Sequence, residues 1–237
     1  MIPTHFIGSL AFNASVAPAE AASFGRMVSS RSCAALAPDA PYDSYGCFSG
    51  SAAELPDGRH LLMYTGVRQE GRDKAKEYQT QCIAVGDGTG YRKYEKNPVL
   101  GADALPEGLS PYDFRDPKIW RTENGTYRCV VGAHRQDKRG VLLQYESRDG
   151  FEWAVRRCAG RERRSVRFHV GMPGFFPLDG KQVVFVSPQD MLPEGFEYHN
   201  GNGTVCLTGQ MDGDRFETVY QARIKGSGGF CSGAGKG

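Results

Sequence analysis

Short β-strand patterns separated by turn residues repeat three times along this chain, and this repetition limits its possible folds more than any other feature. Each unit has four runs rich in Val, Ile, Tyr and Phe. A turn pair follows the first run of each unit: Asp57-Gly58, Asn124-Gly125 and Asp179-Gly180. A spacing of roughly 60 residues between units is typical of a β-propeller, in which each blade is one four-stranded sheet. We predict an all-β fold of the five-bladed β-propeller class, with about three blades here; a β-sandwich is the alternative.

The predicted strands form three sets of four, and no helix is predicted. Their bounds are 46–54, 60–67, 79–85 and 91–94, then 114–121, 126–133, 141–146 and 152–155, then 173–178, 182–187, 204–209 and 216–221. Three stretches lack the strand pattern, namely 1–33, 159–172 and 223–237. We therefore divide the chain into an irregular segment (1–33), a partial propeller domain (34–222) and a disordered Gly-rich tail (223–237).

Charge and hydropathy favour a small neutral partner. The chain has 29 basic and 27 acidic residues, a net charge of +2, which is too weak to predict nucleic-acid or membrane binding. The basic stretch within 159–172 is either a nucleic-acid patch or, as we prefer, a solvated loop. No segment reaches the roughly 18 apolar residues of a membrane span. The oligomeric state is left open.

The seven cysteines predict a reducing compartment. They are widely spread, form no C-x-x-C pair and have no spacing that would hold zinc, so we expect reduced thiols and no metal site. The apolar run near the N-terminus has no basic residue before it, which argues against a secretion signal. We expect a cytoplasmic protein.

One carboxylate, that of Asp116, has the position of a site residue. It lies between Arg115 and Pro117 near the start of a unit's first strand, and propellers turn that strand toward the central channel. Arg115 is suited to bind sugar hydroxyls and to keep Asp116 ionised, because a nearby cation lowers a carboxylate pKa. The structural alternative is an aspartate that satisfies a turn backbone.

The equivalent place in the preceding unit holds Phe48 and Ser49, followed by Gly50. This segment offers an aromatic surface, a hydroxyl and a glycine that permits close approach. Sugar sites combine such groups, because hydroxyls need hydrogen bonds while ring faces stack on apolar surface.

Six motifs together resemble glycoside hydrolase family 32, the family of invertases and sucrose-6-phosphate hydrolases. The resemblance covers about 34–158 and 173–222. The motifs are Ala34-Ala35-Leu36-Ala37-Pro38-Asp39, Gly46-Cys47-Phe48-Ser49-Gly50-Ser51, Leu62-Met63-Tyr64-Thr65-Gly66-Val67, Tyr94-Glu95-Lys96-Asn97-Pro98-Val99, Asp113-Phe114-Arg115-Asp116-Pro117-Lys118 and Val186-Ser187-Pro188-Gln189.

The resemblance implies a five-bladed propeller that hydrolyses β-fructosides with retention, using three acidic residues and no cofactor. Asp116 matches the carboxylate that binds fructose hydroxyls and stabilises the transition state. Arg115, Phe48 and Ser49 match substrate-binding positions. Sucrose, sucrose 6-phosphate and fructans all remain open as substrates.

Two further carboxylates of the family are missing from their expected places. The nucleophile belongs to a Trp-Met-Asn-Asp-Pro-Asn-Gly segment, which does not occur within 1–33. The acid/base glutamate of Trp-Glu-Cys-Pro-Asp aligns with Gly171. Retaining hydrolysis needs both groups, so we expect this chain to be inactive. A non-catalytic fructoside-binding remnant and a broken gene product are the alternatives.

A reading-frame error would explain the missing glutamate. His169-Val170-Gly171-Met172 can be encoded by CAT GTG GGA ATG, and the same bases read one position later spell Met-Trp-Glu and begin Cys. We therefore expect 159–172, and by the same kind of error 1–33 and 223–237, to be frameshifted. Sequencing the coding region tests this. About three blades of five would also leave two apolar sheet faces uncovered, so we expect an aggregation-prone product.

Overall fold

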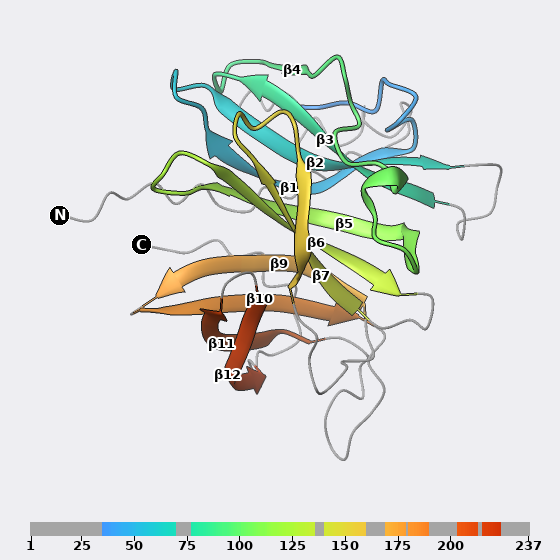
Figure 1. Cartoon of the computed structure of the whole chain (residues 1–237). Helices are drawn as coiled ribbons and strands as arrows, with labels where there is room; N and C mark the ends of the chain where they lie inside the picture. The colour runs from blue at the N-terminus through green and yellow to red at the C-terminus, as the bar shows by residue number, and fades with distance from the viewer. Residues whose placement is uncertain are drawn as a thin grey trace, which may run out of the picture.

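The computed structural model describes residues 35–69, 77–135, 140–159, 169–178, 180–189, 203–212 and 215–223. The predicted irregular segment 1–33 lies outside these residues, as do 160–168 of the basic stretch and 224–237 of the predicted tail. Twelve strands are described, and Figure 1 shows them as three sheets lying one above another. They are β1 (Gly46–Glu54), β2 (His60–Gln69), β3 (Glu77–Gly86), β4 (Tyr91–Lys93), β5 (Leu109–Arg121), β6 (Tyr127–Arg135), β7 (Gly140–Ser147), β8 (Ala154–Ala159), β9 (His169–Leu178), β10 (Lys181–Gln189), β11 (Val205–Asp212) and β12 (Arg215–Arg223).

Each sheet has four antiparallel strands in sequence order. The first sheet is β1-β2-β3-β4, the second is β5-β6-β7-β8 and the third is β9-β10-β11-β12. This order confirms the predicted all-β fold with three sets of four strands. In the described residues, the one helical element is a single 3-10 turn at Ala102–Ala104. No helix in the described part of the chain is long and apolar enough to cross a membrane.

The predicted turns confirm why these runs form hairpins. Gly58, Gly125 and Gly180 all have positive φ, between 73° and 86°, which glycine adopts without steric cost. The first two turns share one hydrogen-bond pattern: Leu55 N donates to Arg59 O, and Thr122 N donates to Thr126 O, both at 2.8 Å. Local turn chemistry thus sets the register of both hairpins.

The basic stretch differs from its predicted irregular structure at both ends. Ala159 is the last residue of β8, and His169 to Met172 are the first four residues of β9. Their sequence has no strand pattern. The backbone there is nevertheless paired with β10 from Gln189↔His169 to Lys181↔Leu178, so tertiary pairing overrides local propensity.

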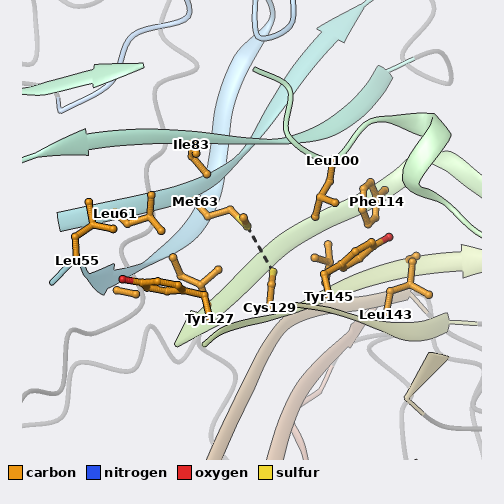
Figure 2. Packing of buried hydrophobic residues seen from close by; sticks show 14 residues of the cluster. Leu55, Leu61, Met63, Ile83, Leu100, Phe114, Tyr127, Cys129, Leu143 and Tyr145 are labelled. Carbon is orange, nitrogen blue, oxygen red and sulfur yellow. Dashed lines mark hydrogen bonds between the residues drawn. The ribbon is translucent and has the colours of Figure 1, made fainter. Parts of the chain in front are cut away.

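The largest core lies between the first and second sheets (Figure 2). Alternate side chains of β2 and β6 face this layer, as period-2 strands require. The Sγ of Cys129 lies 3.5 Å from the Sδ of Met63 across the interface. The fully buried residues of this core include Leu61, Met63, Ile83, Leu100, Phe114, Ile119, Tyr127, Leu143 and Tyr145. A smaller cluster of Val184, Val186 and Val205 packs with Leu142 of the second sheet.

The opposite face of the first sheet is also covered, so for this one face the structure differs from the expectation of two uncovered faces. Leu36 is buried and Tyr42 packs against the same cluster, which contains Leu62, Tyr64 and Cys82. The segment before β1 therefore acts as a cover for this face. Among the described residues, the large apolar side chains that stand exposed are Tyr45, Val155 and Leu178.

Candidate functional site

The three first strands, β1, β5 and β9, are neighbours, because β1 contacts β5 and β5 contacts β9. Each of them carries one extra residue at the same place. Ser49 is the extra residue between Phe48 and Gly50, whose partners Thr65 and Tyr64 are adjacent on β2. Such bulges bend a strand and redirect its side chains.

The bulges on β5 and β9 follow the same rule. Two residues, Asp116 and Pro117, separate Arg115 from Lys118, whereas one residue separates their partners Gly132 and Val130 on β6. On β9, Met172 and Pro173 separate Gly171 from Gly174, opposite Ser187 and Phe185. The shared bulge therefore aligns Phe48, Arg115 and Gly171 as one set of equivalent positions, and Ser49, Asp116 and Met172 as the next.

Asp116 has a strained backbone. Its φ is 61°, and among the described residues it is the one non-glycine with positive φ. The left-handed region costs an L-residue roughly 1–2 kcal/mol, and such strain persists where the surroundings enforce it, often at functional sites. The strain thus falls on the carboxylate that the sequence singles out.

The first sheet holds this bulge by hydrogen bonds to its backbone. Asp116 N donates to Thr65 Oγ1 at 3.0 Å. Ser51 Oγ donates to Pro117 O and accepts from Ile119 N, both at 2.8 Å. Thr65 also pairs with Phe48 across β1 and β2. The structure therefore brings Phe48 and the Asp116 backbone to the same threonine.

Arg115 lies in a second polar group. Its Nη1 is 3.4 Å from Asp113 Oδ1, and Asp113 Oδ2 is 3.5 Å from Nδ1 of the buried His134. The expected effect of Arg115 on the Asp116 carboxylate stays a prediction. Burial lowers the pKa of Lys118, which follows the bulge, because burial disfavours the charged form.

All four predicted site residues are partly accessible. Phe48, Ser49, Arg115 and Asp116 are half-buried, whereas their strand neighbours Gly50 and Pro117 are buried. A half-buried carboxylate and guanidinium can reach a ligand and still be held by the fold. Gly171, at the position equivalent to Arg115, offers no side chain to such a ligand.

Several residues of this arrangement had no role in the sequence interpretation. Thr65, Ser51 and Asp113 lie inside the motifs quoted above, but no function followed from their types. Gln81 and His134 are buried polar residues within apolar strands. In an alternating strand, every second side chain points into the protein. A polar residue at such an inward-pointing position is the one sequence feature that could have identified Gln81 and His134.

The chemistry available here suits recognition of a polyhydroxylated ligand. One carboxylate can accept from two hydroxyls, one guanidinium can donate to others, and Phe48 adds an apolar surface. A pair of facing carboxylates, which glycoside hydrolysis uses, would need a second acid on a neighbouring first strand. β9 has Gly171 at its bulge.

Comparison with known proteins agrees with this geometry. Residues 30–228 match the model of the glycosyl hydrolases family 32 N-terminal domain. The chain is 33% identical over 190 residues to sucrose-6-phosphate hydrolase of Bacillus subtilis, covering 78% of this chain and 38% of that protein. It is 36% identical over 170 residues to the sucrose-6-phosphate hydrolase of Escherichia coli, covering 70% and 34%. This chain thus spans less than two fifths of these relatives.

Solved structures show the same likeness. A β-fructofuranosidase mutant of Bombyx mori in complex with sucrose superposes with a TM-score of 0.68 and 32% identity, covering 80% of this chain and 39% of that one. Its family's propeller fold confirms the predicted class, of which the three sheets form a part. Because the family model spans most of the sequence, the chain belongs to glycosyl hydrolases family 32.

Proposed function

We propose that this chain recognises a β-fructoside at the bulges of β1 and β5, as a relative of the retaining β-fructofuranosidases. Asp116 binds fructose hydroxyls in the role of the transition-state stabiliser, and Arg115, Phe48 and Ser49 complete the contacts. The observation that most supports this proposal is the left-handed backbone conformation of Asp116 at the bulge. Backbone strain of this kind clusters at functional sites, including ligand-binding sites. The names of the relatives support sucrose 6-phosphate as the ligand, and the sucrose complex of the Bombyx mori protein supports sucrose.

We further propose that the chain binds without turnover. Retaining hydrolysis needs a nucleophile and an acid/base facing each other about 5–5.5 Å apart. Gly171 occupies the position where the family has its glutamate, and the nucleophile segment does not occur within 1–33. A non-catalytic fructoside-binding role follows for this chain, whereas hydrolysis is the activity of its family.

The cysteines support a reducing compartment for this function. Cys47, Cys82, Cys129 and Cys206 are free thiols. Burial raises the pKa of Cys47 and of Cys82 to about 12, so both stay protonated near neutral pH. Free thiols are the rule in the cytoplasm, and we propose that location.

Replacing Asp116 with asparagine tests the site. Calorimetry with fructose and sucrose is expected to show binding to the wild-type chain and at least about tenfold weaker binding to Asp116→Asn, since a hydrogen bond to a charged group contributes roughly 1.5–3 kcal/mol. The matched control is Asp103→Asn, which removes an exposed carboxylate of the 3-10 turn and should leave affinity unchanged.

An assay of released fructose separates binding from turnover. The wild-type chain is expected to release no fructose from sucrose. If Asp116→Asn binds fructose and sucrose with the same affinity as the wild type, Asp116 does not contact the ligand. Fructose release by the pure chain would contradict the loss of turnover but leave the binding site in place.

A further inference from the structure

Thr65 and Gln81 form a closed hydrogen-bonded unit around Arg115. Thr65 Oγ1 donates to Gln81 Oε1 at 3.0 Å and accepts from Asp116 N at 3.0 Å. Gln81 Nε2 donates to Phe114 O at 2.6 Å. The pair thus holds the backbone of β5 on both sides of Arg115, from side chains that are 0% exposed.

The donors and acceptors leave little freedom in this unit. A threonine hydroxyl has one proton, and Thr65 donates it in the hydrogen bond to Gln81. The hydroxyl oxygen of Thr65 is therefore left to accept from the Asp116 amide. The two ends of the Gln81 amide have opposite characters and are both engaged, which fixes its orientation. In a buried environment such a connected network is rigid.

We propose that Thr65 and Gln81 are positioning residues, which hold the Asp116 backbone in its left-handed conformation and thereby aim the carboxylate at the fructoside. This inference rests on the proposed function, because it explains how the proposed carboxylate is held. At the bulge the Asp116 N–H is displaced from the regular strand ladder. Thr65 gives this N–H an acceptor. Without that hydrogen bond, nothing in this unit would offset the cost of the strained conformation of Asp116.

The second sheet shows that the fold does not require this polar pair. Phe48 pairs with Thr65, and Thr65 pairs with Gln81. At the equivalent positions Arg115 pairs with Gly132, and Gly132 pairs with Leu142. The second sheet therefore has a glycine and a leucine at the positions where the first sheet has a hydroxyl and an amide. The polar pair occurs where the neighbouring bulge carries Asp116.

Replacing Thr65 with valine tests the proposal, because valine keeps the shape and removes the acceptor. Fructose affinity, measured by calorimetry well below the melting temperature, is expected to fall about tenfold in Thr65→Val and to stay within about twofold of wild type in Thr65→Ser, which restores the hydroxyl. In an Asp116→Asn background, Thr65→Val should change affinity no further. Such non-additivity is expected if Thr65 acts through the Asp116 carboxylate.

A control variant separates positioning from simple stabilisation. Ser147 is buried, and its hydroxyl accepts from Gly150 N at 2.8 Å, away from β5. Ser147→Ala should lower the melting temperature without changing fructose affinity. If Thr65→Val behaves in the same way, the positioning role is wrong.

The backbone amide of Asp116 gives a readout that does not depend on ligand. In NMR spectra of the unliganded chain, Thr65→Val should shift the Asp116 amide proton, change its coupling to Hα and speed its exchange with solvent. If the wild type binds no fructoside, the proposed function fails while this readout still decides on the positioning role. An unchanged Asp116 amide in Thr65→Val would overturn it.

Discussion

Replacing Gly50 with alanine is expected to disrupt the first sheet at the bulge next to Ser49. An added Cβ would lie 2.0 Å from the carbonyl oxygen of Met63 and 2.7 Å from the Cα of Tyr64. Both atoms belong to the backbone of β2, so no side-chain rotation can relieve the overlap. The cost should exceed the roughly 1–3 kcal/mol of ordinary overpacking. A thermal or urea unfolding curve would show a large loss of stability.

Gly90→Ala is the matched control for this variant. A Cβ at Gly90 meets no atom within 4 Å, and its φ lies outside the positive range. Its unfolding midpoint should equal that of the wild type. If Gly50→Ala unfolds at the same denaturant concentration as Gly90→Ala, then β1 and β2 are not as close at the bulge as the structure has them.

Local signals explain why most of the fold could be predicted from the sequence. The range predicted for β1, 46–54, matches the strand, because alternation and the turn at Gly58 are both encoded locally. The start of β9 could not be predicted in this way. Residues 169–172 lack a strand pattern, and their conformation depends on pairing with β10, which is a contact between distant parts of the chain.

The candidate site likewise has residues that the sequence alone identifies and features that depend on contacts between strands. Arg115 and Asp116 could be found because their types and order carry the chemistry. The shared bulge could not be found, since an extra residue is defined only by the register of two strands. Thr65 and Gln81 were missed for a related reason. Their partners are backbone atoms of another sheet, and the sequence of one strand does not say which sheet it will face.

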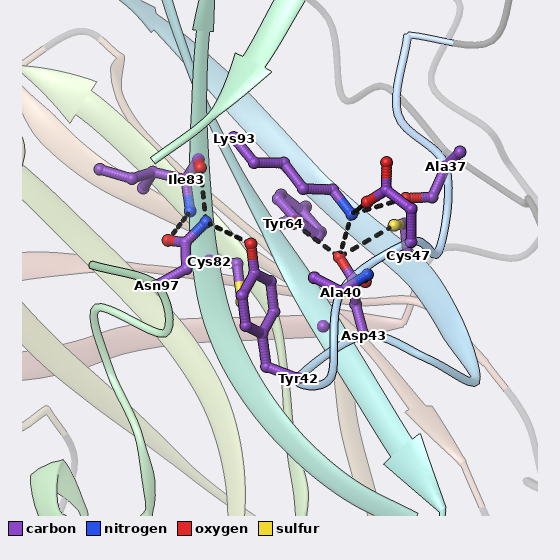
Figure 3. A network of polar contacts seen from close by, with 12 residues as sticks. Ala37, Ala40, Tyr42, Asp43, Cys47, Tyr64, Cys82, Ile83, Lys93 and Asn97 are labelled. Atoms are coloured by element: carbon purple, nitrogen blue, oxygen red, sulfur yellow. Dashed lines mark hydrogen bonds and ion pairs between the residues drawn. The ribbon is translucent and has the colours of Figure 1, made fainter. Parts of the chain in front are cut away.

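A buried ion pair helps to hold the cover over the outer face of the first sheet (Figure 3). Lys93 of β4 forms ion pairs with Asp43, which is 0% exposed, and with Asp39, and it donates to Ala37 O at 2.6 Å. Burial works against the charge of Lys93, but hydrogen bonds with Asp39 and Asp43 outweigh it and raise the pKa of Lys93. Lys93 therefore ties the segment before β1 to the sheet, together with Tyr64, whose hydroxyl also donates to Asp43.

Replacing Lys93 with methionine should destabilise the chain by about 3–5 kcal/mol, because it leaves the buried Asp43 carboxylate without a counter-charge. Tyr64 OH still donates to Asp43 at 2.8 Å, but a neutral donor compensates a buried charge only in part. Urea unfolding measures the loss. Cleavage near Ala37 by a protease of broad specificity should also become faster if the cover is released.

Two further variants decide whether the unpaired charge is the cause. Arg59→Met removes the cation of an ion pair in which both side chains are more than half exposed, and it should change stability little because solvent screens such pairs. The double variant Lys93→Met with Asp43→Asn removes both charges and should recover much of the stability lost in Lys93→Met. If the double variant is as unstable as Lys93→Met, the ammonium group acts through its hydrogen bonds to the cover rather than by neutralising Asp43.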